Sequence, residues 1–221
     1  MMSTKKLLLL MFIINLFFIG IGVLIGHPPE QYFAKEASYI TWVSFFQLLI
    51  ISNLAWQTFK LKNTDSAFLW AIIAVGFLFL SIDEVIRIHE NLDHIIHRTF
   101  HLKETAISDR LDDAIVGVYG LIGLWVLYVY RMELKKYKKV LPLIIIGFIC
   151  VFSMVFSEMI VNRNDVLPFL ISDHTLVKSL YSLFKVLEET FKLLAEGVLL
   201  SAFYYCFKTT KQLAHDFKEN S

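Results

Sequence analysis

Cysteine, proline and charged residues are all scarce in this sequence. The only two cysteines among 221 residues, Cys150 and Cys206, lie inside apolar runs, so neither a disulfide framework nor a cysteine-ligated metal site is expected. Charged residues make up 19% of the chain, the net charge is +1, and no basic patch is interleaved with aromatic residues. We therefore expect no nucleic-acid partner. The sequence also lacks an internal repeat, a glycine-rich phosphate loop and a GxSxG motif, which argues against nucleotide binding and serine-hydrolase chemistry.

Apolar residues dominate instead. Hydrophobic residues make up 57% of the sequence and aromatic residues 15%, including twenty Phe, which is far from the composition of a soluble domain. Six apolar runs are long enough to span a membrane, namely residues 7–25, 39–59, 67–88, 113–130, 140–161 and 180–207. Each should be a helix, because backbone exposed to lipid must satisfy its own hydrogen bonds. We predict an all-α integral membrane bundle of six transmembrane helices that forms a single domain over residues 1–221.

Basic residues in the loops predict the orientation of the bundle. If the N-terminus is cytoplasmic, twelve Lys and Arg residues fall on the inner side: Lys5, Lys6, Lys60, Lys62, Arg131, Lys135, Lys136, Lys138, Lys139, Lys208, Lys211 and Lys218. The outer loops then hold six: Lys35, Arg98, Lys103, Arg110, Arg163 and Lys178. The positive-inside rule places both termini in the cytoplasm. A short chain with this loop bias suits a bacterial plasma (inner) membrane.

One stretch departs from the apolar pattern. Leu78 to Arg98 reads LFLSIDEVIRIHENLDHIIHR, and we expect the third helix to continue through it without a break. Residues three, four and seven apart share a face of a helix. One stripe would therefore hold Asp83, Arg87, Glu90, His94, His97 and His101. The last three histidines should lie just beyond the membrane on a solvated face.

Acidic residues of four helices are expected to meet at one depth. At about 1.5 Å per residue, Asp83 and Glu84 lie roughly 24 Å from the cytoplasmic end of their helix. The same counting brings further acids to this level, just inside the outer boundary: Asp113, Glu158, Glu188 and Glu189. Lys192 and Glu196 lie deeper, nearer the midplane.

Ionisable groups inside a membrane normally face the interior of the bundle and find partners. Ion pairs at i, i+4 spacing would neutralise the charges of the last helix. In these pairs Glu188 and Glu196 share Lys192, and Glu189 pairs with Lys185. In the third helix, Glu84 can pair with Arg87. These pairs leave more carboxylates than bases at this level, so the remaining carboxylates must hold protons or a metal ion.

A metal site fits these residue types, since helical bundles build di-metal carboxylate sites from Glu and His on facing helices. The candidate ligands of a divalent ion such as zinc, iron or manganese are Asp83, Glu84, His89, Glu90, Glu158, Glu188 and Glu189. The His89-Glu90-x-x-Asp93 tetrad has the frame of an HExxH zinc helix, with Asp in place of the second His. Asp83, Glu84 and Glu189 are the candidate catalytic groups. The candidate relay or ion-pair groups are Arg87, Asp113, Lys185, Lys192 and Glu196.

The leading hypothesis is a metal-dependent membrane enzyme, hydrolase-like, that acts on a lipid or another small substrate from the outer face. The first alternative is a proton- or cation-coupled transporter, because charge descends the last helix from Glu188 and Glu189 through Lys192 to Glu196. The second alternative is a structural or accessory membrane subunit whose polar faces meet a partner. The sequence leaves the substrate and the oligomeric state open.

Overall fold

The computed structural model describes residues 2–25, 38–62, 67–101, 110–161 and 166–219. Over these residues every element is a helix and no strand occurs. The elements are α1 (Thr4–Ile25), α3 (Tyr39–Lys60), α4 (Ala67–Ile86), α5 (Ile88–Phe100), α6 (Leu111–Val129), α7 (Arg131–Leu134), the 3-10 helix η2 (Lys135–Val140), α8 (Leu141–Val161), α9 (Val166–Leu170) and α10 (His174–Glu219).

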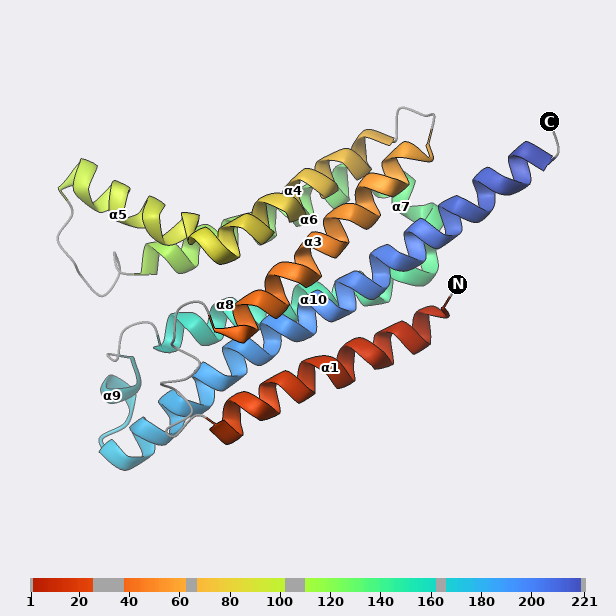
Figure 1. Ribbon diagram of the computed structural model, residues 1–221. Helices are drawn as coiled ribbons and strands as arrows, with labels where there is room; N and C mark the ends of the chain where they lie inside the picture. Colours follow the sequence, from red (N-terminus) through yellow and green to blue (C-terminus); the bar gives the residue numbers. More distant parts are fainter. Residues whose placement is uncertain (1, 26–37, 63–66, 102–109, 162–165, 220–221) are drawn as a thin grey trace.

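Six helical segments of the described chain are long and apolar enough to cross a membrane, and this number equals the number of long apolar helices predicted from the sequence. They are Thr4–Ile25, Tyr39–Lys60, Ala67–Ile86, Leu111–Val129, Arg131–Val161 and His174–Phe217. The long helices run alongside one another, and α1 begins at the end of the bundle where α10 ends (Figure 1). We call this end of the bundle the terminal end. The opposite end carries α5 and α9, and we call it the α5 end.

The last helix is much longer than the predicted span of residues 180–207. α10 covers 46 residues, from His174 to Glu219. Its first turn is capped by the Asp173 carboxylate, which accepts a hydrogen bond from the backbone N–H of Thr175 at 2.8 Å. Apolarity marks only the part of a helix that suits a membrane, so the polar turns at both ends escaped the prediction.

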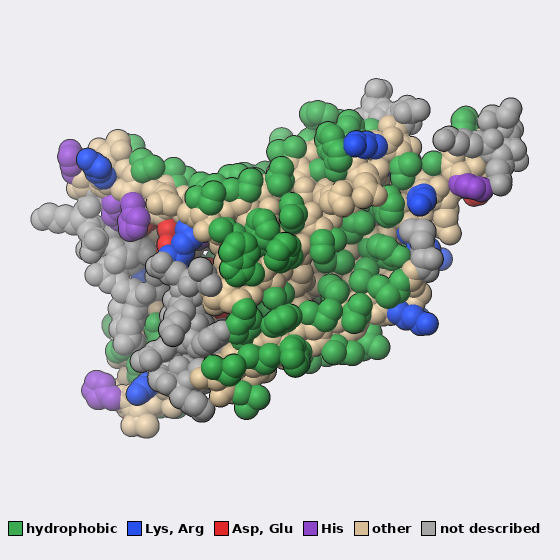
Figure 2. Space-filling view, in the orientation of Figure 1, with side chains coloured by type: hydrophobic (Ala, Val, Ile, Leu, Met, Phe, Trp, Pro, Cys, Tyr) green, Lys and Arg blue, Asp and Glu red, His purple; other side chains and the backbone are tan. Residues whose placement is uncertain are grey.

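Apolar side chains cover the middle of the visible face, and Lys, Arg and His side chains gather toward its two ends (Figure 2). Large apolar side chains are exposed on several helices, for example Phe17 of α1, Val75 of α4 and Trp125 of α6. A water-soluble monomer rarely exposes so much contiguous apolar surface. Lys35, Lys103 and Arg163, which the orientation argument counted, lie outside the described residues.

The hydrophobic core fills the terminal half of the bundle. Trp70 of α4 is fully buried, and its ring meets Tyr137 of η2 edge to face at 5.4 Å and Phe203 of α10 at 6.3 Å. Beside these rings, the buried carboxylate of Glu133 forms ion pairs with Lys62 and with Lys136. Apolar packing and these ion pairs together close the terminal end.

Replacing Lys62 with methionine should destabilise this end. The Lys62 side chain is 12% exposed and that of its partner Glu133 is 2% exposed, so the substitution leaves a buried carboxylate that has lost a buried basic partner. We expect a loss of about 3 kcal/mol in the free energy of unfolding, measured in detergent. Lys136→Met is the matched control, because the Lys136 side chain is 56% exposed and should change stability by less than about 1 kcal/mol. Equal losses for the two variants would contradict this account.

A close approach of α8 to α10 depends on Gly147. A Cβ atom at this position would lie 2.6 Å from Cδ2 of Leu199 and 2.7 Å from its Cγ, well inside van der Waals contact. Small residues at such crossings let membrane helices pack closely.

Gly147→Ala should therefore lower the free energy of unfolding by about 1–3 kcal/mol, because the added methyl group overpacks this crossing. Thermal unfolding in detergent, followed by circular dichroism, measures the change. Gly76→Ala is the control, since nothing lies within 4 Å of a Cβ atom there. Unchanged stability of Gly147→Ala would show that α8 and α10 separate at little cost.

The predicted unbroken helix from Leu78 to Arg98 is wrong. Arg87 adopts a left-handed conformation with φ 58° and ψ 52°, and it separates α4 from α5. Asp83 Oδ1 accepts the backbone N–H of His89 at 2.9 Å, and Asn91 Nδ2 donates to the carbonyl of Ile86 at 3.1 Å. These bonds satisfy backbone groups that the break frees. The predicted stripe from Asp83 to His101 is therefore also wrong, because the turn at Arg87 reorients every later side chain.

Candidate functional site

A cavity of about 820 Å³ lies within the bundle, on the α5 side of the hydrophobic core. It is lined by side chains of α3, α4, α6, α8 and α10, together with residues at the start of α5. Charged groups line the part near the α5 end, and apolar groups such as Phe77, Phe148, Leu199 and Phe203 line the deeper part. The wall therefore has a charged part and an apolar part. We call the charged part near the α5 end the mouth of the cavity, and the apolar part beside the hydrophobic core its floor.

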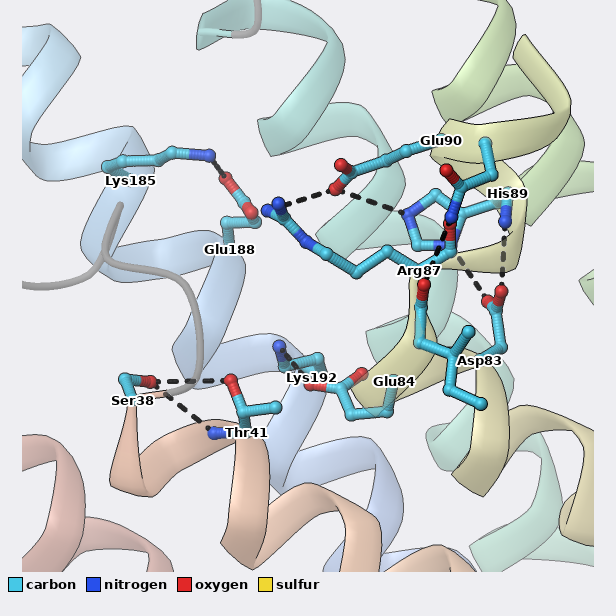
Figure 3. A network of polar contacts seen from close by, with 12 residues as sticks. Ser38, Thr41, Asp83, Glu84, Arg87, His89, Glu90, Lys185, Glu188 and Lys192 are labelled. Carbon is cyan, nitrogen blue, oxygen red and sulfur yellow. Dashed lines mark hydrogen bonds and ion pairs between the residues drawn. The ribbon is translucent and has the colours of Figure 1, made fainter. Parts of the chain in front are cut away.

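The turn at Arg87 places one group of charged side chains at the mouth. Asp83 Oδ2 lies 2.8 Å from Nδ1 of His89, and Arg87 forms an ion pair with Glu90 at 3.0 Å (Figure 3). Nε2 of His89 lies 3.9 Å from Glu90. Asp83 thus caps the first turn of α5 with one oxygen and orients the imidazole with the other.

His89 lies outside the six segments that are suited to spanning a membrane, and its surroundings favour the imidazolium form. Burial alone would lower the pKa of His89, but the hydrogen bond to Asp83 and the negative charges of Asp83, Glu90 and Asp112 outweigh burial and raise that pKa above its ordinary value of 6.5. A raised pKa means that the folded state binds this proton more tightly than the unfolded chain does. The resulting stabilisation is complete below pH 6.5 and is lost as the pH rises through the folded-state pKa.

In Asp83→Asn, the pKa of His89 should fall toward or below its ordinary value. The asparagine oxygen can still accept the N–H of His89, so the local fold is kept while the negative charge is removed. NMR titration of protein carrying ¹³C-labelled histidine in micelles measures this pKa, and His89→Gln identifies the signal. If Asp83→Asn left the pKa of His89 unchanged, this carboxylate would not control the imidazole.

The lysines of α10 form ion pairs with partners other than those predicted from the sequence. Lys192 contacts Glu84 of α4 at 2.9 Å and Glu189 at 2.7 Å, and Lys185 contacts Glu188 at 2.8 Å. The predicted pairs of Lys192 with Glu188 and Glu196, and of Lys185 with Glu189, are therefore wrong. Both observed pairs within α10 use i, i+3 spacing, and the side chain of Lys192 reaches across to α4. That cross-helix pair depends on how the two helices are rotated, which spacing along one helix does not reveal. Glu84 accordingly pairs with Lys192 rather than with Arg87.

Two further glutamates line the cavity and have no basic partner among the described residues. Glu196 is 6% exposed and accepts a hydrogen bond from the Ser44 hydroxyl of α3 at 2.5 Å, while its Oε2 has no hydrogen-bond partner in the described part of the chain. Glu158 of α8 lines the cavity and forms no hydrogen bond or ion pair within the described part of the chain. These two carboxylates are available to a proton or to a bound molecule.

Most of the predicted site residues come together at this cavity. All seven candidate metal ligands line it, as do four of the candidate relay groups, Arg87, Lys185, Lys192 and Glu196. The fifth relay candidate, Asp113, is buried near the start of α6 and is not among the lining residues. Within the described residues, no group of three or more His, Cys, Asp or Glu side chains is close enough to hold a metal ion. The candidate ligands are spread along the wall of the cavity.

The sequence did not predict several other polar residues at the cavity. Asp112 and Tyr119 of α6 line it, and Ser44 of α3, which is not a lining residue, donates a hydrogen bond to Glu196. Tyr119 also meets Phe79 of α4 edge to face, with ring centroids 5.3 Å apart. The only signal for Ser44 was a small polar residue within an apolar run, which is common in membrane helices.

The fold and the cavity define a helical bundle that has six segments suited to spanning a membrane and an internal pocket with a charged mouth. The chain belongs to the family described as Domain of unknown function (DUF8692), whose model matches residues 7–207. That match covers four of the six apolar segments in full, most of the first and of the last, and the described residues of the cavity wall. No curated protein and no solved structure matches the chain.

Proposed function

We propose that this protein is an integral membrane enzyme that binds an amphipathic molecule, such as a membrane lipid, in the cavity and acts on its polar head by proton transfer. The cavity itself carries the proposal, because its charged mouth and apolar floor match the two parts of such a molecule. Its volume of about 820 Å³ falls in the range of about 300–1,000 Å³ that is typical of small-molecule sites.

The proposed orientation has both termini in the cytoplasm of a bacterial cell. The start of α1, the loop after α3, the α7–η2 segment and the last turns of α10 carry many lysines at the terminal end, which the positive-inside rule favours on the inner face. The mouth of the cavity then faces the outer leaflet of the plasma membrane. A lipid of that leaflet could enter with its head at the level of the carboxylates.

We assign the proton transfer to Glu158. The sequence alone favoured Asp83, Glu84 and Glu189, but His89 binds Asp83 and Lys192 binds both glutamates. Glu158 has no such partner among the described residues and lines the same cavity. As a general base, Glu158 would take a proton from a water molecule whose oxygen bonds to the substrate head in a hydrolase-like reaction. The hydrolysable bond of the head would then break, and Glu158 would return the proton to the leaving group. Activation of this water by a divalent metal ion remains a prediction. Analysis of the metal content of protein purified without chelator tests this prediction.

Turnover of lipid in proteoliposomes tests the proposed activity. Protein reconstituted in a total bacterial lipid extract should convert a lipid into products that mass spectrometry detects, and Glu158→Gln should slow the conversion by about 10²–10⁴-fold. Asp216→Asn, in the polar end of α10, is the matched control and should keep full activity. Lipid profiles that remain identical with and without the protein would overturn the enzyme proposal.

A carrier is the second candidate, and Glu196 favours it. This carboxylate is buried deeper along α10 than the charged mouth, and one of its oxygens has no hydrogen-bond partner among the described residues. Buried carboxylates inside membranes commonly carry protons. Proton-dependent flux into liposomes that is lost in Glu196→Gln and kept in Glu158→Gln would favour transport over the enzyme.

A further inference from the structure

We propose that the molecule bound in the cavity is an amphipathic cation, with an apolar chain and an ammonium or similar positively charged head. This inference rests on the proposed function, because it names the class of substrate for the same cavity. It follows from the charges of the cavity wall, from their spacing and from the aromatic rings beside them.

Negative charge is in excess on the wall. The lining residues include eight acids, Asp83, Glu84, Glu90, Asp112, Glu158, Glu188, Glu189 and Glu196. Among the described residues, the wall includes only three Lys or Arg residues, Arg87, Lys185 and Lys192, and one His, His89. Each of these bases already contacts an acid of the wall, so none is left to hold an anionic head. A positively charged head would offset the excess of carboxylates in a region of low dielectric constant.

The carboxylates are spread rather than clustered. Among the described residues, no three acidic or imidazole side chains gather around one point that a metal ion could occupy. Glu158 comes from α8, Glu188 from α10 and Glu84 from α4, so they surround the space from different sides. An ammonium head carries its charge over several groups, and it can contact separate carboxylates without the tight coordination that a small metal ion needs.

Aromatic side chains line the same cavity. Trp42 of α3, Phe79 of α4 and Tyr119 of α6 are part of the wall, and Tyr119 and Phe79 are in contact. Aromatic faces attract organic cations through their quadrupoles, and quaternary ammonium ligands are often held in this way. Carboxylates and aromatic rings around one cavity are therefore both suited to a cationic head, while the apolar floor is suited to its chain.

Three probes that share a dodecyl chain distinguish the contribution of the head group to binding from that of the dodecyl chain. Dodecyltrimethylammonium, dodecanol and dodecyl sulfate are titrated against the full-length protein in nanodiscs, and quenching of tryptophan fluorescence reports binding because Trp42 lines the cavity. The ammonium probe should bind about tenfold or more tightly than the alcohol, which corresponds to about 1.4 kcal/mol, and the sulfate more weakly still. Glu158→Gln should weaken binding of the ammonium probe about tenfold and leave that of the alcohol unchanged.

The outcomes separate this inference from the proposed function. The proposal of a cationic head is overturned if dodecyl sulfate binds as tightly as the ammonium probe, or if Glu158→Gln weakens binding of the ammonium probe and of the alcohol equally. In either case the proposal of a site for an amphipathic molecule stands. If none of the three probes binds in a saturable way, the proposed function fails as well. Asp216→Asn serves again as the control, and it should bind all three probes like the parent protein.

Discussion

Lys192→Met should lower the free energy of unfolding by about 3–5 kcal/mol, the largest loss that we expect from one substitution in the cavity wall. Lys192 is the only base that contacts both Glu84 of α4 and Glu189 of α10 among the described residues. Removing it leaves two carboxylates facing each other at membrane depth without a cation. Unfolding by SDS in mixed micelles, followed by circular dichroism, measures the loss.

A rescue variant shows whether charge causes this loss. The triple variant Glu84→Gln, Glu189→Gln and Lys192→Met removes the base together with both acids, and it should recover most of the lost stability. Arg87→Met is the single-site control, because the Arg87 and Glu90 side chains are 40% and 32% exposed and their ion pair should contribute less than about 1 kcal/mol. If Lys192→Met were as stable as the parent protein, the ion pairs would not hold α4 to α10.

Gly76→Phe should strongly weaken binding of a dodecyl probe while leaving the fold intact. Gly76 of α4 lines the cavity, and nothing lies within 4 Å of a Cβ atom built there. A phenylalanine side chain can therefore extend into the empty space and occupy the position of the ligand's chain. We expect the affinity of dodecyltrimethylammonium to fall by more than about tenfold, measured by the same fluorescence titration.

Gly20→Phe is the matched control for this substitution. Gly20 of α1 also has open space around a built Cβ atom, but it is not a lining residue of the cavity. Both variants add the same side chain to an apolar helix, and thermal unfolding should show similar stability for the two. Binding that is equally strong in both variants would place the probe outside the cavity.

The six spans could be predicted because each is a long apolar run, and the membrane imposes helical structure on such a run. The break at Arg87 could not be predicted in this way. A left-handed conformation is unusual for Arg, and it is held here by contacts from Asp83 and Asn91 that exist only once the turn has formed. The local sequence, with its regular helical spacing, indicated a continuous helix.

The position of the charged wall could also be predicted, because counting residues along each helix brings Glu84, Glu158 and Glu188 to one depth. Their ion pairs could not, since a pair such as Lys192 with Glu84 depends on which faces of α4 and α10 meet. For the same reason Asp113 was expected with the other acids, yet it is buried outside the cavity lining. Depth follows from sequence position, whereas rotation about the helix axis depends on packing of the whole bundle.

Photo-crosslinking tests most directly whether the cavity binds an amphipathic molecule. A dodecyl ammonium probe with a diazirine at the end of its chain is irradiated with the protein in nanodiscs, and mass spectrometry maps the labelled residues. We predict labels on the floor of the cavity, at Phe77, Phe148 and Leu199, that excess unlabelled dodecyltrimethylammonium removes. Labels confined to exposed apolar residues such as Phe17, Trp125 and Ile145 would contradict the account, because the probe would then have met only the outer surface of the bundle.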